Sequence, residues 1–314
     1  MDISVAIYSY LSDMGFAQFI VLAVFVGTFI GSFSNVVIHR LPIMMEREWK
    51  EACEMEMGIE AKEKEKETYN LSTPRSACPK CNKKIAWFDN IPVLSWLFLK
   101  GKCRHCKTRI SYVYPLIELF AGLVSGLFAY ILWPSPMAIV IPLLIITAMI
   151  LLFIDLKHML LPDVITISML WAGLILSVIG INPLTPSESI MGAFFGYGFL
   201  WTVSRVVYYW KGVEGLGFGD IKYISAIGAW VGTPTLLYMI TAICTLAIVM
   251  FGVIWLVDKI VGKDNTIYNE YKEIEEATKK DLGMDDEFKY KRIMPLGPSI
   301  SIVFIAWLMI QYMI

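Results

Sequence analysis

Long apolar segments recur along almost the whole chain, and they limit its fold more than any other feature of the sequence. Of the 314 residues, 57% are hydrophobic, against roughly half in soluble domains. Most of these segments approach the length of about 20 residues with which a helix crosses a bilayer. They comprise residues 16–38, 113–133, 137–154, 164–181, 189–209, 221–233, 235–257 and 295–314. The sequence therefore predicts an all-α polytopic membrane protein with about eight transmembrane helices in the lipid bilayer.

The 27 Lys and Arg residues are distributed unevenly between the loops. If the N-terminus is outside, the loops 40–112, 155–163, 210–220 and 258–294 are cytoplasmic, and the opposite loops contain no Lys or Arg. This distribution agrees with the positive-inside rule. The first 39 residues also lack Lys and Arg, which favours a signal anchor over a cleaved signal peptide. A net charge of −1 gives no indication of nucleic-acid binding.

Two aspartates, Asp155 and Asp220, stand where apolar segments meet the predicted cytoplasmic side. A carboxylate at a membrane boundary is costly to desolvate, so it usually faces a wet cavity and carries a function. Asp220 closes the sequence Gly217-Phe-Gly-Asp220, whose glycines let the backbone approach a substrate closely. Aspartyl proteolysis needs two carboxyl groups that share one proton, one as base and one as acid. The pair therefore predicts an aspartyl protease built into a membrane.

Other interpretations of the acidic residues stay open at this stage. Asp155 can be a boundary residue that pairs with Lys157. Asp163 follows a proline at the start of an apolar segment, where an aspartate usually caps the helix N-terminus. Glu118 either lines the same cavity as the aspartates or hydrogen-bonds a neighbouring helix.

Four cysteines form two C-x-x-C pairs, Cys78 with Cys81 and Cys103 with Cys106, separated by 21 residues. This spacing is typical of a structural zinc ribbon, in which two turns complete one tetrahedron of thiolates. Two disulfides or a redox function are the alternatives, and a reducing cytoplasm disfavours the disulfides. Four sulfur ligands close the coordination sphere, so the Zn²⁺ is expected to be structural. The other nearby candidates are expected to stay outside the site: His105, Cys53 and Cys244.

These features divide the chain into five predicted parts. Residues 1–39 are the first transmembrane anchor, and residues 40–112 are a cytoplasmic loop domain with a charged helix and the four-cysteine site. Residues 113–257 are the membrane-embedded peptidase core. Residues 258–294 are a charged cytoplasmic insertion, and 295–314 form the last transmembrane helix.

Several motifs in this order resemble the bifunctional type IV prepilin peptidases. The motifs are Gly31-Ser-Phe-Ser-Asn-Val-Val-Ile-His-Arg-Leu-Pro42, Ser76-Ala-Cys-Pro-Lys-Cys81, Trp87, Ile91-Pro-Val-Leu-Ser-Trp96, Gly101-Lys-Cys-Arg-His-Cys106, Ile110-Ser-Tyr-Val-Tyr-Pro-Leu-Ile-Glu118, Ile154-Asp-Leu-Lys-His-Met-Leu-Leu-Pro-Asp163, Gly215-Leu-Gly-Phe-Gly-Asp-Ile-Lys222 and Pro295-Leu-Gly-Pro298. The similarity covers nearly the whole chain. The charged insertions 44–70 and 258–292 are longer than the family leads one to expect.

The resemblance implies that Asp155 and Asp220 are the catalytic pair. It also implies a bacterial inner-membrane enzyme that cleaves type IV prepilins and pseudopilins after a glycine, removing a basic leader on the cytoplasmic side. The new N-terminal residue is then N-methylated with S-adenosylmethionine. No glycine-rich nucleotide loop is visible, so the cofactor site is not placed.

Two alternatives to this function differ in what they expect of the aspartates. A cleavage-only peptidase would use the same pair, with a zinc loop that is purely structural. A zinc-binding transporter or scaffold would use Asp155 and Asp220 as ion ligands or proton relays and would not cleave peptides.

Overall fold

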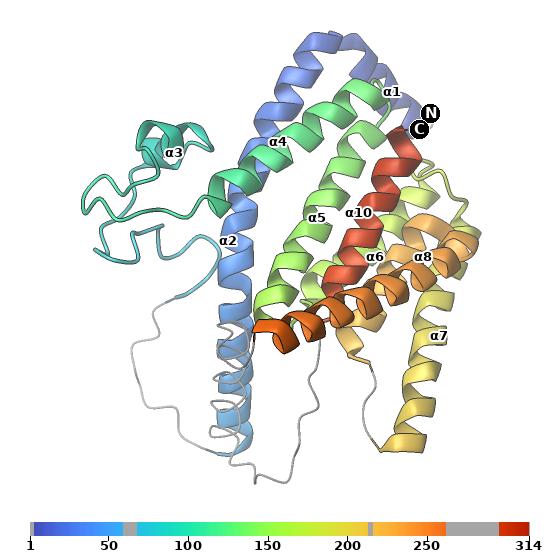
Figure 1. Ribbon diagram of the computed structural model, residues 1–314. Coiled ribbons are helices and arrows are strands. Elements are labelled where there is room, and N and C mark those ends of the chain that lie inside the picture. Colours follow the sequence, from blue (N-terminus) through green and yellow to red (C-terminus); the bar gives the residue numbers. More distant parts are fainter. Residues whose placement is uncertain (1–2, 59–67, 213–215, 262–294, 314) are drawn as a thin grey trace.

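The computed structural model describes residues 3–58, 68–212, 216–261 and 295–313, and these form an all-α structure (Figure 1). The helices are α1 (Ile3–Asp13), α2 (Phe16–Glu56), α3 (Leu94–Phe98), α4 (Val113–Leu132), α5 (Met137–His158), α6 (Asp163–Val178), α7 (Pro186–Lys211), α8 (Phe218–Val261) and α10 (Gly297–Met313), with the 3-10 helix η1 (Trp87–Asn90) before α3. The all-α class that the sequence predicts is confirmed for these residues. Most of the charged insertion 258–294, and part of the insertion 44–70, lie outside the described residues.

Among these helices, five are long and apolar enough to cross a membrane, namely α2, α4, α5, α7 and the part of α8 up to Val253. Two shorter apolar helices, α6 and α10, accompany them. The chain is therefore a multi-pass membrane protein, while the count of eight spans stays a prediction. The helix α1 is not among the elements that the sequence predicts, and its Leu11 carbonyl accepts a hydrogen bond from Trp133 Nε1 at 3.2 Å.

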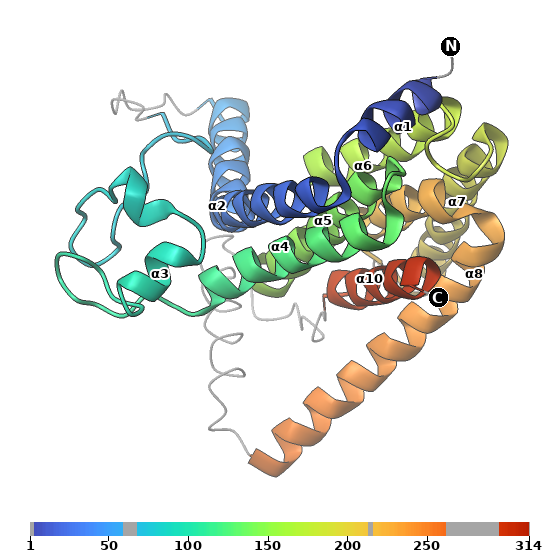
Figure 2. The same cartoon turned by 90° about the horizontal axis from the view of Figure 1, so that it is seen from above.

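The helix α2 is much longer than the predicted first span. It continues without a break through residues 39 and 40 as far as Glu56. The first charged segment after the span is thus helical, as predicted, but it continues the membrane helix instead of forming a separate element. The loop that carries the cysteines stands beside α2 and α4, to one side of the bundle (Figure 2).

Small residues bring α2 and α4 into close contact. A Cβ atom added at Gly31 would lie 2.8 Å from both the Ala121 Cβ and the Glu118 Cα, and one added at Gly27 would overlap the Ser125 side chain. Gly27 and Gly31 are spaced as in the small-xxx-small motif that lets helix backbones approach in lipid. The first span is therefore held to the bundle by backbone proximity.

The contact between α7 and α8 follows the same principle. Gly192 of α7 faces Gly228 of α8 so closely that a Cβ on either residue would overlap the backbone of the other. The helix α8 is interrupted at Gly232, whose φ of 72° and ψ of 168° are not helical, and Pro234 follows inside the next turn. The two predicted spans 221–233 and 235–257 are thus two parts of one interrupted helix.

The centre of the bundle is formed by α5, the first part of α8 and α10. Tyr223 is fully buried there, and its hydroxyl lies 3.1 Å from the Ser301 hydroxyl of α10. Trp230 of α8 donates from Nε1 to the Met169 carbonyl of α6 at 2.9 Å. These contacts fix the first part of α8 against α6 and α10. Beyond Gly232, α8 continues along the core, where Leu236, Met239 and Ile243 are buried, and its last part extends away from the bundle (Figure 2).

The close approach of α7 to α8 yields a first prediction. Gly192→Ala places a methyl group against the Gly228 backbone, which cannot move aside as a flexible side chain would. We expect the free energy of unfolding to fall by about 3 kcal/mol, the upper end of the usual range for overpacking. Thermal unfolding in detergent measures this change. Gly198→Ala on the same helix is the control, because nothing lies within 4 Å of that Cβ position. Equal melting temperatures for both variants would contradict the proposed contact.

Candidate functional site: an aspartate pair and a four-cysteine cluster

Asp155 lies in the last turn of α5 and is buried, with 4% of its surface exposed. The helix ends because Met159 adopts the left-handed conformation at φ 51°, and its amide bonds back to the Asp155 carbonyl at 2.9 Å. The Asp155 carboxylate accepts a hydrogen bond from the Gly297 amide at the start of α10, at 3.0 Å between N and Oδ2. Asp155 is not paired with Lys157 within the described part of the chain, so the boundary-residue interpretation is not supported.

Asp220 occupies the first turn of α8 and is half-buried. The two glycines before it have separate packing roles. A Cβ on Gly217 would lie 3.1 Å from the Asp220 Oδ2, and one on Gly219 would lie 2.9 Å from the Leu161 Cβ. Side chains at these positions would crowd the carboxylate or push the start of α8 away from the segment after α5. Glycine is required here for space rather than for an unusual backbone angle.

The two aspartates are brought together from different helices. Asp155 and Asp220 are separated by 65 residues in the sequence, yet their carboxyl groups are close enough to interact electrostatically. The helix α10 completes the arrangement, because Gly297 contacts the Asp155 side chain directly. The site thus lies where α5 ends and where α8 and α10 begin.

An ion pair links the start of α6 to α8, close to Asp220. Lys222 Nζ lies 2.6 Å from the Asp163 Oδ2, and so links the start of α6 to the first turns of α8. The predicted role of Asp163 as an N-cap is wrong, because Pro162 occupies that position and makes no side-chain cap. The Asp163 carboxylate instead pairs with Lys222 of α8, the helix that carries Asp220.

The four cysteines converge in the loop before α4, as the sequence predicts. Each C-x-x-C pair has the same backbone turn. The Cys78 amide donates to the Lys83 carbonyl and the Asn82 amide to the Cys78 carbonyl, at 3.0 and 2.8 Å. The second pair repeats this pattern from Cys103 to Thr108 and from Lys107 to Cys103, at 2.8 and 3.1 Å. Two equivalent turns therefore present their thiols to one point.

The size of this cluster fits a tetrahedral metal site. The sulfur atoms of Cys78, Cys81, Cys103 and Cys106 all lie within 4.8 Å of one another. The distance between the Cys78 and Cys106 sulfurs is 3.7 Å, and a tetrahedron with Zn–S bonds of about 2.3 Å has edges of about 3.8 Å. All four cysteines are free thiols, so disulfides are not formed. The cluster is compatible with zinc, and His105 is exposed outside it.

The loop is attached to the bundle at two points. Arg40 of α2 donates to the carbonyls of Asn70 and Pro74, at 3.0 and 2.6 Å. Glu118 of α4 accepts a hydrogen bond from the Val93 amide at 2.7 Å. Glu118 was expected either to line the aspartate cavity or to hydrogen-bond a neighbouring helix, and its partner is the residue that precedes α3.

A salt bridge stabilises the loop between its two cysteine turns. Arg104 donates to both oxygens of Asp89, at 2.7 Å from Nε and 2.5 Å from Nη2. These hydrogen bonds lower the pKa of Asp89 below its usual value, because they favour the ionised carboxylate. The second turn is thereby fixed to the short helix η1.

Two family models match the chain in consecutive regions. The model for the bacterial peptidase A24 N-terminal domain matches residues 25–132, and the model for the type IV leader peptidase family matches residues 142–253. A relative from Aeromonas salmonicida is 45% identical over 208 residues, which are 66% of this chain and 71% of the relative. The chain belongs to the type IV leader peptidase family.

Further relatives of this family agree with the assignment. A Pseudomonas aeruginosa protein is 42% identical over 68% of this chain and 73% of its own length. One from Neisseria gonorrhoeae is 40% identical over 74% of this chain and 82% of its own length. All three relatives are named prepilin leader peptidase/N-methyltransferase. No solved structure matches the chain.

The family models cover both candidate sites. The four cysteines lie within the N-terminal match, 25–132, and the two aspartates lie within the peptidase match, 142–253. Sequence reasoning did not identify the Gly297 amide or the attachment through Arg40. The Pro295-Leu-Gly-Pro298 motif contains Gly297. The motif does not reveal the contact, because the donor is a backbone amide and not a characteristic side chain.

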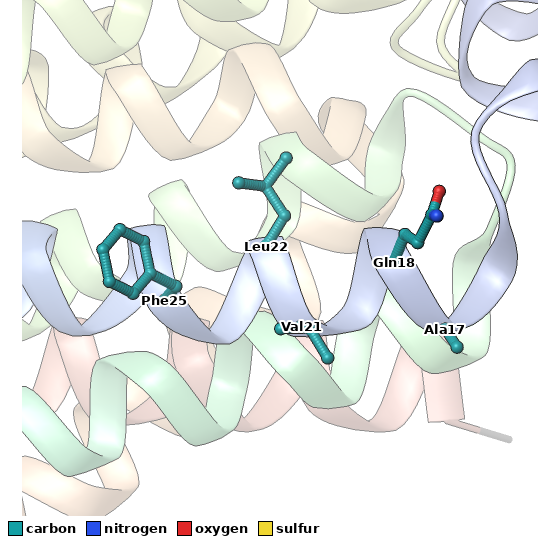
Figure 3. Close-up of a pocket in the computed structure, with 5 residues that line it drawn as sticks. All are labelled: Ala17, Gln18, Val21, Leu22 and Phe25. Atoms are coloured by element: carbon teal, nitrogen blue, oxygen red, sulfur yellow. The ribbon is translucent and has the colours of Figure 1, made fainter.

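A surface hollow of about 470 Å³ lies along the first part of α2 in this chain (Figure 3). It is lined by residues of α2 alone: Ala17, Gln18, Val21, Leu22 and Phe25. The neighbouring Phe19 packs against Ala138 at the start of α5, whereas Asp155 is in the last turn of that helix. The hollow is thus a lipid-side feature of a predicted span, at the opposite end from the aspartates.

The cysteine cluster yields a second prediction. We expect about one zinc per chain in the purified protein, measured by elemental analysis, and loss of that zinc in Cys103→Ser, whose thiol is buried in the cluster. Cys244→Ser is the matched control, because Cys244 is exposed on α8 and outside the cluster. Zinc retained at full occupancy in Cys103→Ser would show that the four thiols are not its ligands.

Proposed function

We propose that this protein is a membrane aspartyl endopeptidase that removes the leader from type IV prepilins and pseudopilins and then N-methylates the new N-terminus. The observation that carries the proposal is the meeting of Asp155 and Asp220 at one junction of three helices. Membership of the type IV leader peptidase family supports the same activity. So do the relatives named prepilin leader peptidase/N-methyltransferase.

In this mechanism the two carboxyl groups hold one proton between them, since two like charges at short distance are unfavourable. The ionised carboxylate takes a proton from water, and the neutral one donates to the oxygen of the scissile carbonyl. The Gly297 amide fixes the orientation of the Asp155 carboxylate through its bond to Oδ2. The ion pair between Asp163 and Lys222 holds the start of α8, and with it Asp220, against α6.

The proposed topology puts this chemistry on the cytoplasmic side of the inner membrane. The N-terminus is outside, and the two parts of α8 on either side of Gly232 count as separate spans, which gives eight. The absence of Lys and Arg from the opposite loops supports this orientation. A prepilin can then lie in the bilayer as an apolar helix, with its polar leader at the level of the aspartates.

The four-cysteine cluster would hold a structural zinc ion, which supplies a cross-link between the two halves of the loop. The spacing of its sulfur atoms supports this role. The methyl group for the new N-terminal amine comes from S-adenosylmethionine. No residue of this chain is assigned to that cofactor, because the sequence has no glycine-rich nucleotide loop. Methyl transfer is therefore supported by the family alone.

The proposal is tested by mass spectrometry of a prepilin incubated with the purified protein and S-adenosylmethionine. We expect the leader to be lost and one methyl group to be added. Asp155→Asn and Asp220→Asn should each reduce cleavage by about a hundredfold to ten-thousandfold, because an amide cannot exchange the proton. Asp13→Asn, an exposed position on α1, is the control and should cleave normally.

Each other outcome of this experiment selects a different function. Cleavage without a methyl group would support the cleavage-only peptidase. Normal cleavage by either aspartate variant would remove that residue from the mechanism. If the folded wild-type protein does not cleave, the zinc-binding scaffold becomes the better explanation.

The contact between α10 and Asp155 yields a further prediction. Gly297→Ala would place its Cβ 2.5 Å from the Asp155 Oδ2 and so displace the carboxylate. We expect cleavage to fall by about a hundredfold, as for a misplacement of about 1 Å in an active site. Gly252→Ala in α8 is the control, because nothing lies within 4 Å of that position. Equal cleavage rates for the two variants would show that α10 does not position Asp155.

A further inference from the structure

The short helix α3 has its apolar side facing outward. Leu94, Leu97 and Phe98 share one side of the helix and are 53%, 58% and 85% exposed. We call these three residues the α3 face. Ser95 and Trp96 point inward, where their side chains donate to the carbonyls of Phe88 and Ile110. A loop surrounded by water would be expected to have the opposite arrangement.

Two more exposed aromatic rings precede the α3 face. Trp87 and Phe88 of η1 are 75% and 46% exposed, and their ring centroids lie 5.7 Å apart. Ser95 ties this segment to α3, because its hydroxyl donates to the Phe88 carbonyl at 2.8 Å. Trp, Phe and Leu are the residues with which peripheral helices enter the boundary between lipid headgroups and acyl chains.

The structure also ties α3 to the predicted cytoplasmic end of a span. The bond from the Val93 amide to Glu118 lies directly before α3, and Glu118 is in the second turn of α4. With a rise of about 1.5 Å per residue, Glu118 lies roughly 8 Å from the start of α4, and its carboxylate holds the residue before α3 near that level. The helix α3 thus stands near the first turns of this predicted span, to one side of the bundle (Figures 1 and 2).

This attachment requires an uncommon backbone conformation. Val93 has φ 59° and ψ −53°, and the Leu94 amide bonds to the Pro92 carbonyl as in a γ-turn. A positive φ is unfavourable for a β-branched residue. The hydrogen bond to the Glu118 carboxylate offsets this cost, so Glu118 sets the position of α3.

The charge of the loop indicates which surface the α3 face meets. Residues 68–112 contain nine Lys and Arg residues and one acidic residue, Asp89, which is paired with Arg104. Basic segments next to a span are attracted to anionic lipid headgroups. A second copy of this loop carries the same charge and would be repelled. A basic prepilin leader would be repelled as well.

We propose that the cysteine loop docks on the surface of the bilayer beside α4, with the α3 face inserted among anionic lipid headgroups. The basic side chains of the loop then contact the headgroups, and Glu118 fixes the depth of α3. The loop is held at the membrane on two sides, by α2 through Arg40 and by lipid through α3. The proposal rests on the membrane location of the chain and is independent of peptidase activity.

Photo-crosslinking of the full-length protein tests this proposal. A benzophenone amino acid replaces Phe98 in protein reconstituted into nanodiscs of phosphatidylcholine mixed with phosphatidylglycerol, and adducts are identified by mass spectrometry. We expect several-fold more lipid adducts than from the same group in place of Trp49. Trp49 is an exposed aromatic residue on the extension of α2 beyond the first predicted span. Zinc content reports that each variant is folded.

The contrary outcomes are equally specific. Lipid adducts no more frequent at position 98 than at position 49 would overturn the proposal. Adducts to a second protein chain instead of lipid would assign the α3 face to an interface between copies. An unchanged adduct yield in phosphatidylcholine alone would overturn the role of anionic headgroups.

The role of Glu118 is tested in the same nanodiscs. Glu118→Leu removes the acceptor for the Val93 amide, and we expect the lipid adducts at position 98 to fall several-fold. Glu118→Gln keeps an acceptor oxygen and should retain them. Equal adduct yields in the two variants would show that Glu118 does not set the depth of α3.

Discussion

Close contact between helix backbones is the constraint on which the rest of this structure depends. In lipid, apolar side chains gain little by leaving one apolar environment for another, so helices associate through tight packing and hydrogen bonds. Glycines and small residues provide that packing between α2 and α4 and between α7 and α8. The first part of α8, which carries Asp220, is fixed in this way against α7. Hydrogen bonds tie it to α6 and α10, and α10 in turn holds Asp155 of α5 through Gly297.

The aspartate pair depends on helix ends more than on helix faces. Asp155 is in the last turn of α5, Asp220 is in the first turn of α8, and Gly297 begins α10. Backbone amides at a helix start have no partner within their own helix, and one of them is used here to hold a carboxylate. Polar groups at the ends of apolar helices can thus meet without a charged side chain crossing the centre of the bilayer.

The sequence was sufficient to predict the all-α class, the positions of most apolar helices and the four-cysteine cluster, but not α1 or the full length of α2. Apolar length and C-x-x-C spacing are local patterns that tertiary contacts do not change. It did not predict that Asp163 pairs with Lys222, that Glu118 binds the Val93 amide or that Gly297 holds Asp155. These contacts join segments far apart in the chain, and two of them use backbone amides, which every residue but proline has. The catalytic roles of Asp155 and Asp220 stay a prediction.

The unbroken course of α2 has a mechanical consequence. At about 1.5 Å per residue, its 41 residues extend about 60 Å, twice the thickness of about 30 Å of a hydrocarbon core. One continuous helix, with Pro42 in its interior, therefore joins the packed first span to a charged end beyond the predicted span. A change in the tilt of the span moves that far end, and a force on the far end reaches the glycine contacts with α4 by way of Pro42.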